Sequence, residues 1–158
     1  MREVLFRGKT KTGIWIEGFL FQTECDGVKE WNISMSPLSA NDYSEILGDY
    51  GDVIPETVGQ YTGLTDKNGK KIFDGDIVKV VVNRHVCDKI DVREEKGLID
   101  YDAMGMLSLV LYFHNDVPIY SDVFNELSLS SCVQDFHFEL IGNIHDNPEL
   151  LKGAENNG

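Results

Sequence analysis

The stretch GLTDKNGKKIFDGDIVKV, residues 63–80, decides how the rest of the chain is interpreted. It places acidic and amide side chains among glycines, directly before an apolar run that begins at Ile77. Oxygens in that setting either bind a cation or form tight turns between strands. A cation loop would suggest chemistry, whereas a pair of turns would suggest a small β-fold.

A calcium loop of the EF-hand type does not fit this stretch. Such a loop takes oxygen ligands at its first, third and fifth positions, glycine at the sixth and a bidentate glutamate at the twelfth. Counted from Asp66, the fifth, sixth and twelfth positions hold Lys70, Lys71 and Ile77. The lysine ammonium groups would also repel a cation.

Two turns account for the same residues. In the first, Asp66 begins the turn, Asn68 follows, and Gly69 takes the position that needs a positive φ angle. In the second, Asp74 and Gly75 turn the chain into the following strand. We therefore predict that these five residues have a structural role.

Short segments rich in β-branched and aromatic residues predict strands on both sides of these turns. They lie at residues 4–9, 13–22, 28–34, 77–82, 106–113 and 136–142. The segment 13–22 is apolar on both faces, which predicts a central strand. Helical signals are few: one short helix within residues 36–52, and a turn or two over 147–151, where Asn147 suits the cap and Pro148 the first position. The predicted fold class is mostly β (α+β), with a small β-barrel or sandwich-like sheets and a few short helices.

The 158 residues divide into three predicted regions. Residues 1–58 form an N-terminal β-rich region with one short helix, residues 59–152 form a C-terminal β-barrel-like region, and residues 153–158 are a polar tail. Five acidic residues from Asp42 to Glu56 have no basic neighbour in the sequence, which suggests an exposed connection between the first two regions.

The formal net charge of -13 limits the classes of partner. A field of that sign repels phosphate backbones and anionic lipid, so we expect no direct contact with nucleic acid and none with a membrane. No apolar run approaches the length that spans a bilayer. Three cysteines that are odd in number and far apart favour a reducing compartment, so we expect a cytoplasmic protein: Cys25, Cys87 and Cys132.

Four aromatic residues could in principle stack on nucleobases: Trp15, Trp31, Tyr61 and Tyr112. A stacking face also needs lysine and arginine along it. In a domain of this size we expect the four to belong to the core instead.

Basic residues are unevenly distributed. The stretch from Lys67 to Lys96 holds eight lysines and arginines, whereas none lies between Lys96 and Lys152. Acids in the second stretch suggest an interaction surface, which we assign to Asp100, Asp102, Asp116, Asp122 and Asp135. Three explanations fit: solubility alone, a homo-oligomer in which these acids meet the lysine-bearing stretch of another copy, or a mimic of nucleic acid that inhibits a DNA-binding protein of the host.

Signals for catalysis are weak. The chain lacks Walker, GxGxxG, GxSxG and HExxH motifs. His85 and Cys87 would point to one side of a strand, but zinc needs about four ligands and no second pair has a compatible spacing. Two acid pairs lack an adjacent nucleophile or oxyanion donor: Asp74 with Asp76, and Asp100 with Asp102. We expect no catalytic, metal-binding or cofactor-binding residues.

Three segments of the chain resemble the YopX family of phage and prophage proteins. They are PETVGQYTGLTDKNGKKIFDGDIVKV at residues 55–80, REVLFRGKTKTGIWIEGF at 2–19 and FELIGNIHDNPELL at 138–151. Residues 36–51 and 82–98 show no family pattern. The resemblance implies a small soluble protein of a bacterial virus or prophage, located in the host cytoplasm, and it implies no particular activity.

These observations predict a non-enzymatic protein-interaction module that forms a homo-oligomer. The alternatives are the acidic nucleic-acid mimic and an accessory hydrolase whose carboxylates bind a divalent cation. A thermal melt with and without magnesium, manganese or calcium separates the cation-dependent hydrolase from the interaction module, because a bound ligand stabilises the folded form.

Overall fold

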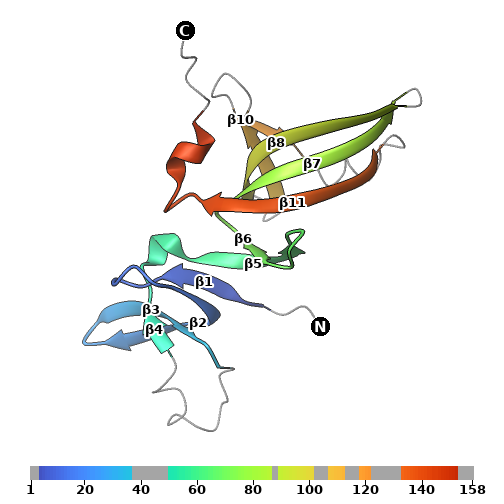
Figure 1. Ribbon diagram of the computed structural model, residues 1–158. Helices are drawn as coiled ribbons and strands as arrows, with labels where there is room; N and C mark the ends of the chain where they lie inside the picture. Colours follow the sequence, from blue (N-terminus) through green and yellow to red (C-terminus); the bar gives the residue numbers. More distant parts are fainter. Residues whose placement is uncertain are drawn as a thin grey trace. The chain divides into compact units, whose positions relative to one another are not determined.

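The computed structural model describes residues 4–36, 50–86, 89–101, 107–112, 118–121 and 133–152, and nearly all of its elements are strands (Figure 1). The predicted mostly-β class is confirmed. The strands are β1 (Phe6–Lys9), β2 (Trp15–Cys25), β3 (Val28–Ser34), β4 (Tyr50–Asp52), β5 (Gly59–Thr65), β6 (Lys71–Phe73), β7 (Asp76–Val86), β8 (Lys89–Tyr101), β9 (Leu107–Tyr112), β10 (Pro118–Ser121) and β11 (Val133–Asn143). Two short 3-10 helices are η1 (Pro55–Thr57) and η2 (Pro148–Leu151).

The chain forms two compact units, Met1–Gly63 and Leu64–Gly158. Of the segment 36–52, where a helix is predicted, residues 37–49 lie outside the described ranges and Tyr50–Asp52 is β4. The predicted polar tail, 153–158, also lies outside them. Within the described ranges, no helix has the length and apolar character needed to cross a bilayer.

The first unit is an antiparallel sheet in the order β4-β3-β2-β1-β5. The central position predicted for residues 13–22 is confirmed, because β2 pairs with β1 through residues 15–18 and with β3 through residues 19–25. A bridge between Thr10 and Val53 brings the residue after β4 beside the end of β1. Leu5, Ile33 and Val53 are buried in this unit.

Gly18 lies where β2 changes its partner from β1 to β3. A Cβ atom at this position would lie 1.9 Å from the carbonyl oxygen of Ser34. Gly8 is also restricted, because a Cβ atom there would lie 2.9 Å from Cβ of Val53. The coiling of this small sheet therefore depends on glycine at points of close backbone approach.

The second unit contains an open antiparallel sheet in the order β10-β9-β8-β7-β11 (Figure 1). β7 and β8 form a long hairpin whose register runs from Ile77 opposite Leu98 to Val86 opposite Lys89. β11 pairs with the other side of β7 and is the last strand of the sheet. β5 crosses the boundary between the units at Gly63, and its end neighbours β6.

Among the described residues of the second unit, buried apolar side chains form two clusters. Alternating residues of β7 divide between them, because successive side chains of a strand point to opposite faces. One cluster contains Ile72, Val78, Val80, Ile99 and Phe138. The other contains Ile77 and Leu98, against which pack Ile141 and, from η2, Leu150 and Leu151.

Parts of the predicted fold are wrong in detail. The described strands do not close into a barrel; they form two antiparallel sheets. The C-terminal helical turn is the 3-10 helix η2, and Asn147 precedes it without a side-chain capping hydrogen bond. Five observed strands fall outside the predicted segments: β4, β5, β6, β8 and β10.

Candidate functional site

The environment of Asp66 shows whether residues 63–80 form a cation loop or a turn. The residue is buried, with 6% of its surface exposed. Its Oδ1 accepts hydrogen bonds from the backbone N–H groups of Asn68 at 2.8 Å and Lys70 at 2.9 Å. Its Oδ2 accepts one from Nδ2 of Asn68 at 3.3 Å, and the carboxylate also accepts one from the backbone N–H of Leu140. These donors occupy both oxygens, which a cation site would direct at the ion.

Asp66 begins a three-residue hairpin loop between β5 and β6. The N–H of Gly69 donates to the carbonyl of Asp66 at 3.0 Å, and the N–H of Asp66 donates to the carbonyl of Lys70 at 2.8 Å. Gly69 has a φ of 81°, in the left-handed region. This is the pattern of a type I turn followed by a left-handed glycine, in which Asp66, Lys67 and Asn68 take the first three turn positions.

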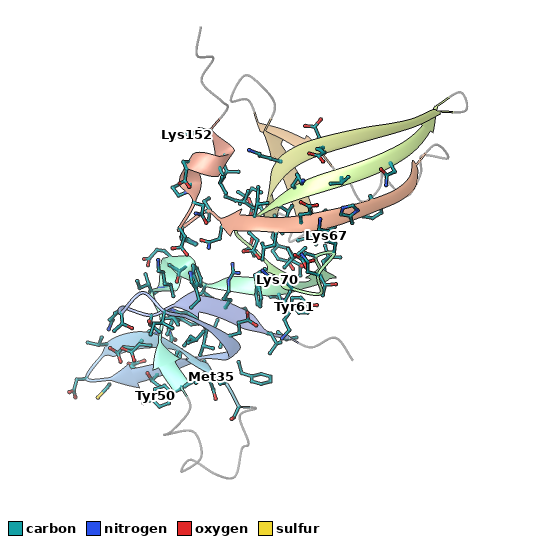
Figure 2. All side chains as sticks on the ribbon, in the orientation of Figure 1. Met35, Tyr50, Tyr61, Lys67, Lys70 and Lys152 are labelled. Carbon is teal, nitrogen blue, oxygen red and sulfur yellow. The ribbon has the colours of Figure 1, made fainter. Side chains whose placement is uncertain are left out.

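The same loop contacts a strand that is distant in the sequence. The backbone N–H of Lys67 donates to the carbonyl of Phe138 on β11 at 2.9 Å. Figure 2 shows Lys67 beside β11. Together with the hydrogen bond from Leu140 to Asp66, this contact joins the β5–β6 loop to the edge of β11.

Hydrogen bonding also sets the charge of Asp66. Burial by itself would raise the pKa of this carboxyl, but hydrogen bonds from Lys70, Asn68 and Leu140 outweigh burial and lower the pKa below its ordinary value. The side chain is therefore a carboxylate at neutral pH, and main-chain N–H groups stabilise its charge.

The second predicted turn, at residues 73–76, is also held by main-chain contacts. Asp76 is fully buried, and its Oδ2 accepts a hydrogen bond from the N–H of Phe73 at 2.8 Å. Gly75 has a φ of 82°. Its N–H donates a hydrogen bond to the carbonyl of Ile99, and its carbonyl accepts one from the N–H of Ile144, both at 2.9 Å. The turn therefore connects β8 with the segment that follows β11.

Asp74 is the acid with the most unusual ionisation at these turns. Burial, followed by the negative charge of Asp100, raises the pKa of Asp74 from 3.8 to about 6. The charge of Asp76 adds to this effect, and the nearby backbone N–H of Gly75 opposes it. The folded protein therefore disfavours the charged form of Asp74 at neutral pH.

Replacing Asp74 with asparagine is expected to stabilise the protein above pH 6. The raised pKa means that the folded state holds the proton more tightly than the unfolded chain, so stability falls as pH rises from about 4 to about 6 and stays lower above that. Because Asp74 is only half-buried, solvent screening reduces the effect, and we expect a gain of about 1 kcal/mol at pH 7.5.

Urea unfolding at pH 3.5 and pH 7.5 tests this expectation. The gain should be present at the higher pH and absent at the lower one. Glu149→Gln removes the same charge at an exposed position of η2 and serves as the matched control. An equal gain at both pH values would contradict the assigned cause.

Glu139 on β11 holds the charged network of the second unit. Its Oε1 pairs with Nζ of Lys67, and its Oε2 lies 2.9 Å from Nζ of Lys79. Nζ of Lys79 also lies 3.6 Å from Glu94, and Nε2 of His137 lies 3.8 Å from Glu139. Hydrogen bonds from Lys67 and Lys79 lower the pKa of Glu139 to about 2. These contacts place a second interaction between the β5–β6 loop and β11.

The acids predicted as an interaction surface do not all belong to the described part of the chain. Asp100 on β8 is half-buried and acts electrostatically on Asp74. Asp135 belongs to β11, where it pairs with Asn83 of β7. The others lie outside the described ranges: Asp102, Asp116 and Asp122. Asp100 is therefore the one acid of the predicted interaction surface whose side chain the structure describes.

The predicted histidine and cysteine pair is described only in part. His85 lies in β7 opposite Ile90, and Cys87 falls outside the described ranges. Among described residues, no group of three or more histidine, cysteine, aspartate or glutamate side chains has the arrangement of a metal site.

The aromatic residues of the first unit are more exposed than predicted. Trp31 is 36% exposed, and Trp15 and Tyr61 are half-buried, so the expectation that they belong to the core is wrong for Trp31. Trp15 lies beneath the guanidinium of Arg7, which is 4.8 Å from the ring centre, and Nζ of Lys9 is 5.9 Å from it. These cations cover the ring of Trp15 in the folded protein.

Two structural residues were missed from sequence. Glu139 was not singled out from the sequence, although its contacts connect β11, β7 and the β5–β6 loop. Asn143 was not singled out, yet its Oδ1 accepts the N–H groups of His145 at 3.0 Å and Asp146 at 2.9 Å. The Asn at the end of an apolar strand could have indicated this turn. No local pattern indicates the contacts of Glu139, because they are long-range.

Comparisons with known proteins place the chain in a family. No curated protein matches it. A crystal structure of protein EF1440 from Enterococcus faecalis is similar to it, with 22% sequence identity, a TM-score of 0.43, and coverage of 96% of this chain and 100% of that chain. The family described as YopX protein matches residues 5–152, nearly the whole chain. The chain therefore belongs to the YopX family.

Proposed function

We propose that this YopX-family chain is a non-enzymatic protein-interaction module of a phage or prophage, and that it acts as a homo-oligomer. The observation that carries the proposal is the environment of Asp66. Its carboxylate accepts hydrogen bonds from Asn68, Lys70 and Leu140, so this acid stabilises the β5–β6 loop and its contact with β11. A structural role for these acids favours binding by surfaces over catalysis.

The charge distribution supports self-association in this proposal. Glu139 already engages Lys67 and Lys79 within one copy, which illustrates how acids of β11 complement the lysine-bearing stretch. Two other lysines of that stretch, Lys70 and Lys96, are exposed. Between copies, these lysines would meet the acids that follow Lys96 in the sequence.

Reversing the charges of Lys70 and Lys96 is expected to weaken self-association about tenfold, because like charges would then face one another across the interface. The variant is Lys70→Glu combined with Lys96→Glu, measured by sedimentation velocity over a range of protein concentrations. Lys29→Glu combined with Lys152→Glu is the matched control, since both residues are exposed and lie outside the stretch.

Salt provides the second arm of this experiment. Assembly between complementary charges should dissociate as ionic strength rises, because exposed charges are screened. Sedimentation that is the same at low and high salt, or an equal effect of both double variants, would contradict the proposed oligomer.

A further inference from the structure

β11 forms an edge of the five-stranded sheet. Among the described strands, β7 is its partner on one side and no strand follows it on the other side. A long edge strand presents backbone donors and acceptors that can pair with a strand of another molecule. Folded proteins limit such pairing by covering the edge or by placing charges on it.

The β5–β6 loop covers the middle of this edge. The N–H of Lys67 donates a hydrogen bond to the carbonyl of Phe138, and the carboxylate of Asp66 accepts one from the N–H of Leu140. The ion pair between Lys67 and Glu139 adds a side-chain contact at the same place. Two successive outward positions of β11 are thus bonded to a loop that cannot continue the sheet, because its next residues turn back into β6.

We infer that this loop guards β11 against edge-to-edge pairing with β11 of a second copy of the chain. The outward backbone groups at Phe138 and Leu140 identify which positions would pair, because outward-facing residues alternate along a strand. Phe136, two residues earlier, belongs to the same series. The guarded segment therefore runs from Phe136 to Leu140.

The sequence of that segment is complementary to itself. In an antiparallel pair with its two-fold axis at Phe138, Phe136 of one copy lies opposite Leu140 of the other. His137 then lies opposite Glu139, on the other face of the sheet. Apolar residues face apolar residues and a histidine faces a carboxylate, which an isologous contact requires of both copies at once. A second copy is for this reason the occupant that the exposed edge would select.

One substitution at Lys67 separates the backbone contact from the ion pair. Lys67 is the second residue of a type I turn, where proline fits the backbone, so Lys67→Pro keeps the turn but removes the N–H that Phe138 accepts. Lys67→Ala removes the same side chain and keeps the N–H. Both variants lose the ion pair with Glu139. The difference in self-association between them therefore measures the effect of the backbone hydrogen bond to Phe138.

We expect Lys67→Pro to self-associate at least about tenfold more tightly than Lys67→Ala in sedimentation velocity, since the freed edge gains backbone hydrogen bonds in the pair. The runs are made at high salt, where the charge-mediated oligomer proposed above is dissociated. Retention of the Lys67→Pro dimer at high salt supports the guard even if that oligomer is disproved. Equal sedimentation of the two folded variants overturns the inference.

Asp66→Asn covers the case in which Lys67→Pro does not fold. Asparagine replaces one of the two carboxylate oxygens by a nitrogen, which cannot accept a hydrogen bond, and it removes the negative charge to which the loop and Leu140 N–H groups donate. We expect tighter self-association than in the wild type at high salt, together with faster hydrogen exchange at the Leu140 amide. Unchanged self-association of folded Asp66→Asn also overturns the inference.

Discussion

Replacing Gly18 with alanine is expected to lower the free energy of unfolding of the first unit by about 4 kcal/mol, which is enough to unfold much of it. The new Cβ atom would lie 1.9 Å from the carbonyl oxygen of Ser34 and 2.7 Å from its carbonyl carbon. Both contacts are with backbone, so no side-chain rotation relieves them. β2 and β3 must separate at the residues where β2 changes partner.

Tryptophan fluorescence during urea unfolding measures this effect selectively. The chain has two tryptophans, Trp15 on β2 and Trp31 on β3, and both belong to the first unit. Gly27→Ala is the matched control: its φ of 77° disfavours alanine, but nothing lies within 4 Å of the added Cβ. The control should cost only about 1 kcal/mol, the penalty for a left-handed conformation. Equal losses in the two variants would contradict the close approach of Gly18 to Ser34.

Replacing Asp66 with alanine is expected to lower the thermal midpoint of the second unit by about 5 to 10 °C. The substitution leaves three backbone N–H groups without their acceptor, those of Asn68, Lys70 and Leu140. An unsatisfied buried donor is more costly than a lost surface contact. The loss therefore affects both the loop and its attachment to β11.

Circular dichroism during thermal unfolding measures this loss, with Asn68→Ala as the matched control. That variant keeps the backbone N–H of residue 68 and removes only the 3.3 Å side-chain contact, so it should change the midpoint little. A control that is as unstable as Asp66→Ala would show that the loop as a whole, and not this carboxylate, sets the stability.

Acid should weaken the same attachment. The lowered pKa of Asp66 and the pKa of about 2 at Glu139 both favour the charged forms in the folded protein. Their contribution to stability is complete above the ordinary pKa of a carboxyl, and it is lost as pH falls from about 4 toward 2. Asp74 has the opposite dependence, because its pKa is raised.

The turns around residues 63–80 were predictable because their causes are local. Gly69 and Gly75 have positive φ angles, which glycine adopts without a steric penalty, and Asp66 accepts hydrogen bonds from residues two and four positions ahead. The strands 77–82 and 136–142 were predictable for a similar reason, since β-branched and alternating apolar residues identify them without knowledge of a partner.

The remaining features depend on pairing across the sequence. Residues of β8 such as Glu94 and Lys96 do not resemble a strand. Backbone pairing with β7 places them in the sheet, opposite Val81 and Lys79. Lys67 pairs with Glu139, which lies 72 residues later in the sequence, and no local sequence pattern predicts a pair at that separation. Neither Gly18 nor Asn143 was assigned a role, because each is required by contacts that only the folded chain defines.

Hydrogen exchange at the amides of Asn68, Lys70 and Leu140 tests the central claim most directly, because these N–H groups donate to Asp66. The protein is measured in a chelator and again with excess calcium, magnesium or manganese. We predict that the three amides are protected in the chelator and that cations do not change their exchange rates. Protection that requires a cation would contradict the account, since Asp66 would then organise the loop around an ion.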